Sequence, residues 1–385
     1  MDVIIEAMAL SQTRGGVTTY VRELVSHLTS LYPNDKIEIL YGNTGGTGQF
    51  HPQTTETVIP LRSEVLLPYW LSYPVARHIR SRKIAVSHFT KAALPRTAVG
   101  PTVVTIYDII PLLLPESQSP LRRLYWPAVL EHAAKHASHI MTISEQSKKD
   151  IMERYGVTDA NITVTPLAVD LEHFKPERSS STLGVSPLTP RVFLSRKPYI
   201  LFVGTKDRRK NISSLIRAFA AIADKVPHRL LIAGKQAHKK DTSELTVDSC
   251  KLQDRVEFLE NVSYSELPAL YSNADIFVWP SVYEGWGFPP QEAMACGTPV
   301  IVSNGGPLPE VVGDAGIIVP FQSPRLADRM NDEEFIENLA HEMLALISDE
   351  KKKSELIRRG LDRVRQFSWE DVARKTHEAY VKVSL

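Results

Sequence analysis

YEGWGFPPQEAMACGTPVIVS, residues 283–303, is the most informative part of the amino-acid sequence. It places Glu284 and Glu292 eight positions apart, on either side of two glycines and two adjacent prolines. Proline is favoured in the first turn of a helix, so the motif predicts a loop that enters a helix at about residue 290, with Glu292 in the first turn. Free N–H groups at a helix N-terminus attract anions, and carboxylates accept hydrogen bonds from hydroxyl groups. The motif therefore favours a site for an anionic or hydroxyl-rich ligand over an ordinary helix start.

A cluster of cations lies in FVGTKDRRKNISSLIRAF, residues 202–219. A predicted strand ends at Gly204, and Arg208, Arg209 and Lys210 come directly before a predicted helix. Cations beside the positive end of a helix dipole are unfavourable unless an anion binds there. The turn thus predicts a diphosphate site, with a solvated basic loop as the structural alternative.

Gly15 and Gly16, in SQTRGGVTTYVREL at residues 11–24, follow the first predicted strand. Such a turn can bind phosphate through its N–H groups, although two glycines alone are weak support. The sequence has no Gly-x-Gly-x-x-Gly there, which disfavours a nicotinamide dehydrogenase.

The length of 385 residues exceeds the roughly 150 of one typical domain, so two domains are expected. Short β-branched runs alternate with helical patterns, which predicts parallel sheets. We expect a first domain at 1–175, a linker at 176–197, a second domain at 198–368, and a helix at about 369–385 that packs back on the first. Strands are expected at 2–8, 36–40, 84–88, 102–107, 138–143 and 161–165, and then at 199–203, 229–233, 255–258, 275–278, 299–302 and 316–319.

Composition excludes several classes of protein. Forty-five Lys and Arg against 44 Asp and Glu leave a net charge of +1, which does not favour nucleic acid as a partner. Cys250 and Cys296 are isolated, so neither a zinc site nor a disulfide framework is indicated, and a cytoplasmic setting fits best. No apolar run is long enough for a spanning helix, and the N-terminus does not resemble a secretory signal.

Taken in order, these motifs resemble glycosyltransferase family 4, the retaining nucleotide-sugar enzymes of the GT-B fold. The resemblance rests on the glycine pair, on VGTKDRRKN, and on the two-glutamate block that continues into EAMACGTPVIVSNGGPLPEVVGDAG. It implies an α/β protein with two doubly wound Rossmann-like domains that face a central cleft. The first domain would bind the acceptor and the second the nucleotide-sugar donor.

The resemblance also implies roles for individual residues. Arg209 and Lys210 would bind the diphosphate, Glu292 the ribose, and Glu284 the transferred sugar. The remaining expected donor-site residues are Gly15, Gly16, Gly204, Asn261, Val262, Tyr264, Gly287 and Phe288, with the base near 261–264.

One position departs from the family pattern. Members have a His-Asp pair after a strand of the first domain, and here Tyr107 precedes Asp108. Tyr107 would hydrogen-bond the sugar instead, or His88 at a neighbouring strand end would reach the cleft, or the site is altered. For His88, a polar residue that caps a strand end is an equal alternative.

The expected chemistry requires no metal or other cofactor. Cation side chains and helix N-termini would stabilise the leaving diphosphate as the anomeric bond breaks. The sequence lacks the Asp-x-Asp pair that metal-dependent nucleotide-sugar enzymes of the other major fold use. The favoured reaction is transfer of mannose from GDP-mannose to a lipid-linked glycan in O-antigen synthesis. A UDP- or dTDP-sugar donor, a non-catalytic scaffold, and a phosphorylase or epimerase are alternatives.

Segment 62–96 combines seven basic residues and one acidic residue with leucine, tyrosine and tryptophan. Amphipathic segments of this composition can rest on anionic lipid headgroups, which favours peripheral contact with the inner face of the membrane. A solvated basic helix with core aromatics is the alternative.

Overall fold

The computed structural model describes residues 1–11, 15–43, 53–61, 66–115, 120–177, 198–235, 243–323 and 325–385. The chain divides into two compact units: unit 1 is Met1–Leu167 with Ser368–Leu385, and unit 2 is Ala168–Phe367. The units thus divide earlier than the expected boundary at 175. Residues 178–197, nearly all of the expected linker, lie outside the described residues.

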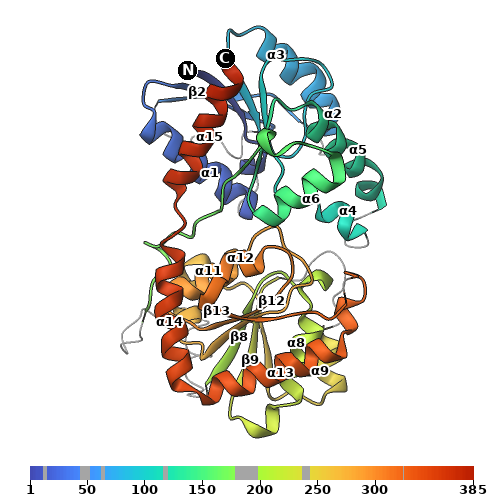
Figure 1. Ribbon diagram of the computed structural model, residues 1–385, viewed down its shortest axis with the longest axis vertical. Helices are drawn as coiled ribbons and strands as arrows, with labels where there is room; N and C mark the ends of the chain where they lie inside the picture. Colours follow the sequence, from blue (N-terminus) through green and yellow to red (C-terminus); the bar gives the residue numbers. More distant parts are fainter. Residues whose placement is uncertain are drawn as a thin grey trace. The chain divides into compact units, whose positions relative to one another are not determined.

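Unit 1 contains a parallel sheet of seven strands in its described part, in the order β3-β2-β1-β4-β5-β6-β7 (Figure 1). The strands are β1 (Asp2–Glu6), β2 (Lys36–Tyr41), β3 (Thr54–Val58), β4 (Val86–Phe89), β5 (Thr102–Thr105), β6 (His139–Thr142) and β7 (Ile162–Val164). Strand β3 was not expected, because its sequence TTETV is polar and its residues are mostly only half-buried at the edge of the sheet. The predicted parallel arrangement is confirmed.

Helices cover the sheet of unit 1. They are α1 (Gly16–Leu31), α2 (Leu67–Trp70), the π-helical turn η4 (Leu71–Val75), α3 (Ala76–Arg80), α4 (Ile110–Leu113), α5 (Pro120–His136), α6 (Glu145–Tyr155) and α15 (Trp369–Ser384). The last helix, α15, packs against α1 and contacts β4 and β5, as Figure 1 shows in red beside blue. Its apolar face buries Val372, Ala373 and Tyr380 at helical spacing. The end of the chain therefore completes the first unit, as the sequence predicted.

Unit 2 contains a second parallel sheet, with six described strands in the order β10-β9-β8-β11-β12-β13. Its strands are β8 (Tyr199–Val203), β9 (Arg229–Ala233), β10 (Val256–Leu259), β11 (Ile276–Trp279), β12 (Val300–Ser303) and β13 (Gly316–Val319). Its helices are α8 (Ile212–Ala220), α9 (Ser243–Ser249), α10 (Leu267–Ser272), α11 (Phe288–Ala295), α12 (Leu308–Val312), α13 (Glu333–Ser348) and α14 (Glu350–Val364). The contacts of α13 with α8 and of α14 with α11 build a layer on each face. Both units are doubly wound.

The strand order of unit 2 reverses between β8 and β11, which pair directly although they are not consecutive. After the carboxyl end of β8 the chain enters the turn that contains Arg208, Arg209 and Lys210, which we call the basic turn. After the carboxyl end of β11 it enters the loop that contains Glu284, which we call the glutamate loop. In open α/β sheets this reversal point opens a crevice at the carboxyl ends of the strands, where ligands bind. The fold therefore brings the two strongest motifs of the sequence together.

Candidate functional site

The basic turn begins at Gly204, which follows β8 and lies against the indole of Trp279 on the neighbouring strand β11. A Cβ atom at Gly204 would lie 2.7 Å from Cη2 of Trp279, so only glycine fits there. After Gly204, the Asp207 carboxylate accepts a 2.9 Å hydrogen bond from the Arg209 N–H and caps the 3-10 turn η7 (Arg208–Lys210). This packing fixes the backbone from which both Arg209 and Lys210 project.

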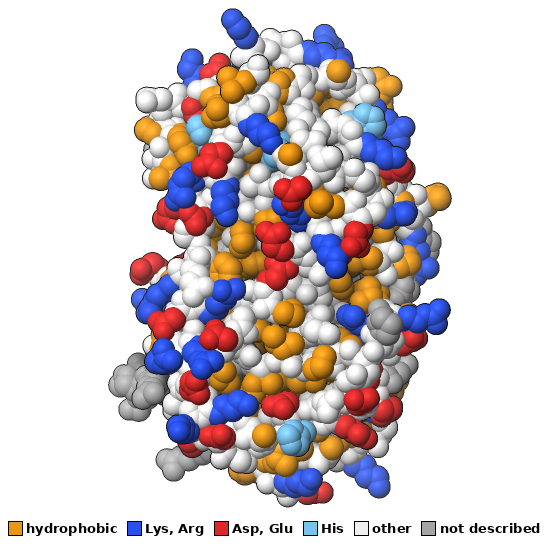
Figure 2. Space-filling model, in the orientation of Figure 1, with side chains coloured by type: hydrophobic (Ala, Val, Ile, Leu, Met, Phe, Trp, Pro, Cys, Tyr) orange, Lys and Arg blue, Asp and Glu red, His pale blue; other side chains and the backbone are white. Residues whose placement is uncertain are grey.

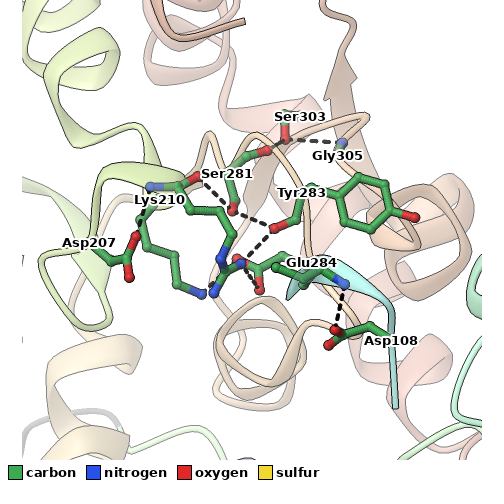
Figure 3. A network of polar contacts seen from close by, with 10 residues as sticks. Asp108, Asp207, Lys210, Ser281, Tyr283, Glu284, Ser303 and Gly305 are labelled. Carbon is green, nitrogen blue, oxygen red and sulfur yellow. Dashed lines mark hydrogen bonds and ion pairs between the residues drawn. The ribbon is translucent and has the colours of Figure 1, made fainter. Parts of the chain in front are cut away.

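Glu284 pairs with two of the three cations of this turn, Arg209 and Lys210. Its Oε2 lies 2.7 Å from Nη1 of Arg209, and its Oε1 lies 2.6 Å from Nζ of Lys210 (Figure 3). Glu284 is 7% exposed and Lys210 is 9% exposed. The sequence predicted that the cations need an anion, and a carboxylate of the glutamate loop lies against two of them.

The pKa values of these groups reflect burial and pairing. Burial alone would raise the pKa of Glu284, but Arg209 and Lys210 outweigh it and lower this pKa to about 2. Burial, with help from Arg209, lowers the pKa of Lys210 to about 8, against the opposing effect of Glu284. At neutral pH the site therefore contains two cations and one carboxylate.

Backbone contacts join the basic turn to the glutamate loop. Arg209 donates from Nη1 to the Tyr283 carbonyl at 2.5 Å, and the Val282 N–H donates to the Arg209 carbonyl at 2.9 Å. Ser281 also donates from Oγ to the Arg209 carbonyl, at 3.1 Å. The loop and the turn thus form one hydrogen-bonded structure.

The segment after β12 supports the same loop from behind. Ser303 donates from Oγ to the Ser281 carbonyl at 2.5 Å, as Figure 3 shows. A Cβ atom at Gly305 would lie 2.2 Å from the Ser281 carbonyl oxygen. Gly306 has φ +66°, and its Cβ would lie 2.5 Å from the Glu284 carbonyl oxygen. Sequence reasoning did not include Gly305 and Gly306 in the site, although the adjacent glycines were the signal.

Glu292 lies in the second turn of α11, so its predicted place in the first turn is wrong. The helix begins at Phe288, before the two prolines, with Gly287 as the residue that precedes it. Glu292 accepts a 2.7 Å hydrogen bond at Oε2 from the Tyr271 hydroxyl. Burial raises the pKa of Glu292 to about 7, and the hydrogen bond only partly opposes that rise. The second glutamate therefore titrates near neutral pH.

The segment expected near the base contains an aromatic pair. The Tyr264 ring stacks on His173 with ring centroids 3.9 Å apart and planes within 4° of parallel. Nε2 of His173 lies 2.9 Å from the Tyr264 carbonyl oxygen. Asn261 has φ +60° and is exposed, while Val262 is half-buried. His173 is 91 positions from Tyr264, and nothing in the sequence indicated that they meet.

In unit 1, Tyr107 and Asp108 follow β5. Oδ1 of Asp108 accepts a 2.9 Å hydrogen bond from the Ile110 N–H, where α4 begins. The Tyr107 hydroxyl is buried and, within the described ranges, has no hydrogen-bond partner. Its ring packs edge-to-face on Tyr20 at 5.3 Å. Burial raises the pKa of Tyr107 far above its ordinary value, so the hydroxyl stays protonated and can donate.

The structure does not support His88 as a residue that reaches the sugar. His88 is fully buried, with Nδ1 2.6 Å from the Tyr380 hydroxyl and Nε2 2.7 Å from Oγ1 of Thr105. Burial lowers the pKa of His88 to about 3, so the ring stays neutral. Both ring nitrogens are used inside unit 1, and the residue joins β4 and β5 to α15.

Gly15 and Gly16 are exposed at the start of α1, next to residues 12–14, which lie outside the described residues. Among the residues that the structure describes, no group of three His, Cys, Asp or Glu side chains is arranged to hold a metal ion. Within the same residues, no helix is both long and apolar enough to cross a membrane.

Two family profiles match the chain, one on each half. The family described as Glycosyltransferase Family 4 matches residues 14–173, and the family described as Glycosyl transferases group 1 matches residues 190–363. The O-antigen chain mannosyltransferase B of Escherichia coli is 30% identical over 326 residues, which cover 83% of this chain and 81% of that protein. The O-antigen chain mannosyltransferase RfbU of Salmonella typhimurium is 30% identical over 252 residues, 65% of this chain and 64% of that protein.

Solved structures with the same architecture cover nearly the whole chain. The sucrose-phosphate synthase of Thermosynechococcus elongatus has a TM-score of 0.74 at 22% identity, and the match covers 100% of this chain and 99% of that one. Anabaena HepE in complex with UDP-glucose has a TM-score of 0.73 at 17% identity, with 99% and 100% covered. At these identities the likeness concerns the fold, which is the GT-B arrangement of two Rossmann-like domains.

Proposed function

This chain belongs to the group 1 and family 4 glycosyltransferases, and from that premise we propose that it is a retaining hexosyltransferase. Its proposed reaction moves mannose from GDP-mannose to a lipid-linked glycan of a cell-surface polysaccharide such as O-antigen. The observation that carries the proposal is the buried cluster of Arg209, Lys210 and Glu284 at the carboxyl ends of β8 and β11. The similarity to two O-antigen mannosyltransferases supports the choice of sugar.

Arg209 and Lys210 are proposed to bind the donor diphosphate. Negative charge grows on the leaving diphosphate as the anomeric C–O bond breaks, and cations fixed beforehand in a buried site stabilise that charge most strongly. The diphosphate oxygen then takes the acceptor proton, and the acceptor oxygen attacks from the same face of the sugar. Two side-chain cations, the buried Lys210 and the half-buried Arg209, supply the charge for which other enzymes use a divalent metal, so the proposed reaction needs no metal cofactor.

The remaining donor contacts are assigned to unit 2. Glu292 would accept hydrogen bonds from the ribose hydroxyls, and the segment from Asn261 to Tyr264 would contact the base. Gly287 and Phe288 would offer backbone groups to the sugar that Glu284 holds. In unit 1, Tyr107 would donate its buried hydroxyl where other family members use histidine.

A uridine diphospho-sugar is the alternative donor, because a solved protein of the same fold binds UDP-glucose. The Tyr107 departure favours a second alternative, a scaffold that binds nucleotide without turnover. The test is to incubate the purified protein and membrane-extracted lipid-linked glycans with GDP-mannose, UDP-glucose or dTDP-glucose. Release of GDP and mannosylation of the lipid fraction with an α linkage support the proposal. If only UDP or dTDP is released, the donor is the corresponding UDP- or dTDP-sugar and not GDP-mannose. If nucleotide binds but no nucleoside diphosphate is released, the protein is a scaffold.

Peripheral membrane contact is proposed for one face of unit 1, which we call the α2–α3 face. Leu66, Tyr69 and Tyr73 are 46%, 61% and 60% exposed. The two tyrosine rings lie 4.8 Å apart, and exposed Arg77 and Arg80 follow at helical spacing. Exposed Lys83, just after α3, is counted with this face. Exposed tyrosine and leucine beside cations suit the headgroup region of an anionic bilayer. On the side of the molecule that Figure 2 shows, Lys and Arg side chains are interspersed with Asp and Glu. We place the protein at the cytoplasmic face of the membrane.

A further inference from the structure

We propose that Glu284 competes with the diphosphate of the spent donor for Arg209 and Lys210, and so promotes release of the nucleoside diphosphate after sugar transfer. This inference rests on the proposed function, because it takes the basic turn to be the diphosphate site. It adds a second task for Glu284 beyond holding the sugar.

The geometry of the Glu284 ion pairs is the first support. The Glu284 carboxylate uses one oxygen for each cation, at 2.7 Å to Arg209 and 2.6 Å to Lys210. These are the distances at which phosphate oxygens bind the same groups. A diphosphate that takes both cations must therefore displace the carboxylate or share them with it.

The contacts of Arg209 and Lys210 determine which group moves when a diphosphate binds to them. Lys210 lies 4.4 Å from the centroid of the Trp279 ring, and Arg209 also bonds the Tyr283 carbonyl. These contacts and the capped turn hold the two cations, so the carboxylate is the group that has to change partners. Its own backbone is fixed from behind by Gly306, which leaves a side-chain rotation as the available movement.

The intact donor and the product nucleoside diphosphate differ in what they offer to the displaced carboxylate. An intact donor carries sugar hydroxyls that can donate to the displaced carboxylate, which gives Glu284 a new set of partners. A free nucleoside diphosphate has lost the transferred sugar and its hydroxyls, so the displaced carboxylate is left beside two or three negative charges without those hydrogen bonds. The carboxylate should therefore return to Arg209 and Lys210, and weaken binding of the product more than binding of the donor.

The test compares Glu284→Gln with a matched control. The control is Glu260→Gln, because Glu260 also pairs with a buried lysine of unit 2, Lys206 at 3.3 Å, and its replacement removes the same charge. Isothermal titration calorimetry at pH 7 measures binding of inorganic pyrophosphate, GDP and GDP-mannose, with UDP and UDP-glucose in parallel. We expect Glu284→Gln to bind pyrophosphate and the nucleoside diphosphate about tenfold more tightly, and the sugar nucleotide with a smaller gain. Glu260→Gln should bind like the unaltered protein.

A further variant separates charge from folding. Glu284→Asp keeps the negative charge, so its pyrophosphate affinity should stay within about threefold of the unaltered protein. Glu284→Gln leaves two buried cations without their carboxylate, so its Tm should fall and pyrophosphate should restore it. Circular dichroism confirms that each variant is folded before titration.

Equal or weaker pyrophosphate binding by folded Glu284→Gln would overturn the inference while leaving the diphosphate site in place. An equal gain in Glu260→Gln would also overturn it, because the effect would then be a general change in charge. If neither the unaltered protein nor any variant binds pyrophosphate or a nucleoside diphosphate, the basic turn is not a diphosphate site. The proposed function then fails together with the inference.

Discussion

The Tyr271 hydroxyl donates a 2.7 Å hydrogen bond to Oε2 of Glu292, and so joins α10 to the helix that carries the second glutamate of the motif. Tyr271 is itself fully buried. Burial raises the pKa of Glu292 to about 7, whereas this hydrogen bond favours the ionised form and limits the rise. Burial and this hydrogen bond together therefore set the pH at which Glu292 becomes a carboxylate.

Nucleotide binding should depend on pH through Glu292. If the ionised carboxylate accepts the ribose hydroxyls, affinity should rise about tenfold between pH 6 and pH 8, as a group with a pKa near 7 ionises. Tyr271→Phe removes the bond that favours the carboxylate, so the rise should move to higher pH. Calorimetric titration of GDP across this range measures both. The terminal phosphate of the nucleotide also titrates, near pH 6, and contributes its own pH dependence. Glu292→Gln is the reference, because it should lose the contribution of Glu292 and keep that of the phosphate.

The same pKa makes a prediction about stability. The folded pKa of about 7 lies above the ordinary 4.5, so the folded state holds a proton that the unfolded state has lost between these values. Stability from this group therefore falls as pH rises from 4.5 to 7. Glu292→Gln should raise the free energy of unfolding by about 1–3 kcal/mol at pH 8 and change it little at pH 4.5. Urea denaturation at the two pH values checks this, and no difference between them would contradict the buried carboxyl.

Lys210→Ala should lower kcat more than it raises KM. Charge on the leaving diphosphate grows only as the bond breaks, so Lys210 in its proposed role should stabilise the transition state more than the bound donor. We expect kcat to fall about 100-fold or more, as for loss of a preorganised electrostatic group. Steady-state kinetics with varied donor measures the two constants separately. A change in KM alone would mean that Lys210 only holds the ground state.

The core of the fold was predictable because buried parallel strands are short β-branched runs. The expected strands at 199–203, 229–233 and 316–319 coincide with β8, β9 and β13. The polar edge strand β3 carries no such signal and was missed. The helical segment that begins at Leu67 contains a π-helical turn with Pro74 inside it, because burial of Trp70 and Leu71 outweighs the local preference of the sequence.

The candidate site was only partly predictable. The sequence indicated that the cations of the basic turn need an anion, but nothing local shows that this anion is a glutamate 74 positions away from Lys210. Their meeting follows from the crossover that places β11 beside β8. The histidine at position 88 looked available because a strand end is often solvent-accessible, yet a helix 292 positions later covers it. Contacts between residues far apart in the sequence therefore determine both the partner of Lys210 and the burial of His88.

Gly305→Ala should disable the site. The added Cβ would lie 2.2 Å from the Ser281 carbonyl oxygen, and backbone has to shift because no side chain can yield. A shift of the glutamate loop by about 1 Å is enough to lower kcat about 100-fold. Gly156→Ala is the control: its φ of +68° strains any side chain, but an added Cβ meets open space, so no neighbouring backbone has to shift. It should cost about 1–2 kcal/mol of stability and leave kcat unchanged. Kinetics and thermal unfolding of the two variants make the comparison.

His88→Asn should affect stability and leave nucleotide binding intact. The folded pKa of His88, about 3, lies below the ordinary 6.5, so the unfolded state takes up a proton first and stability is lost as pH falls through this window. His88→Asn should therefore shrink the loss of stability between pH 6.5 and pH 4, which we put at up to about 3 kcal/mol. At pH 7.5 the variant should be less stable by about 1–3 kcal/mol, because the Tyr380 and Thr105 hydroxyls lose their partner. Loss of GDP binding in the folded variant would contradict a structural role.

The α2–α3 face should bind anionic vesicles. Replacing Arg77 and Lys83, both exposed, by Ser removes two charges at about 1 kcal/mol each, which corresponds to a roughly 30-fold loss of affinity for vesicles with 30% anionic lipid. Tyr69→Ser should weaken binding in high salt too, because its contribution is apolar, whereas salt screens the cations. The charge-matched control replaces Lys351 and Lys352, which are exposed on α14.

These variants also separate the membrane from the reaction. Activity on a short water-soluble acceptor should survive in all of them, because the donor groups Arg209, Lys210 and Glu284 lie in unit 2. Activity on a lipid-linked acceptor in vesicles should fall in parallel with vesicle affinity, since the face only raises the local acceptor concentration. Vesicle co-sedimentation and the two activity assays are run on the same preparations. An equal loss on both acceptors would place Arg77 and Lys83 in acceptor binding, and unchanged co-sedimentation would make the face an ordinary solvated surface.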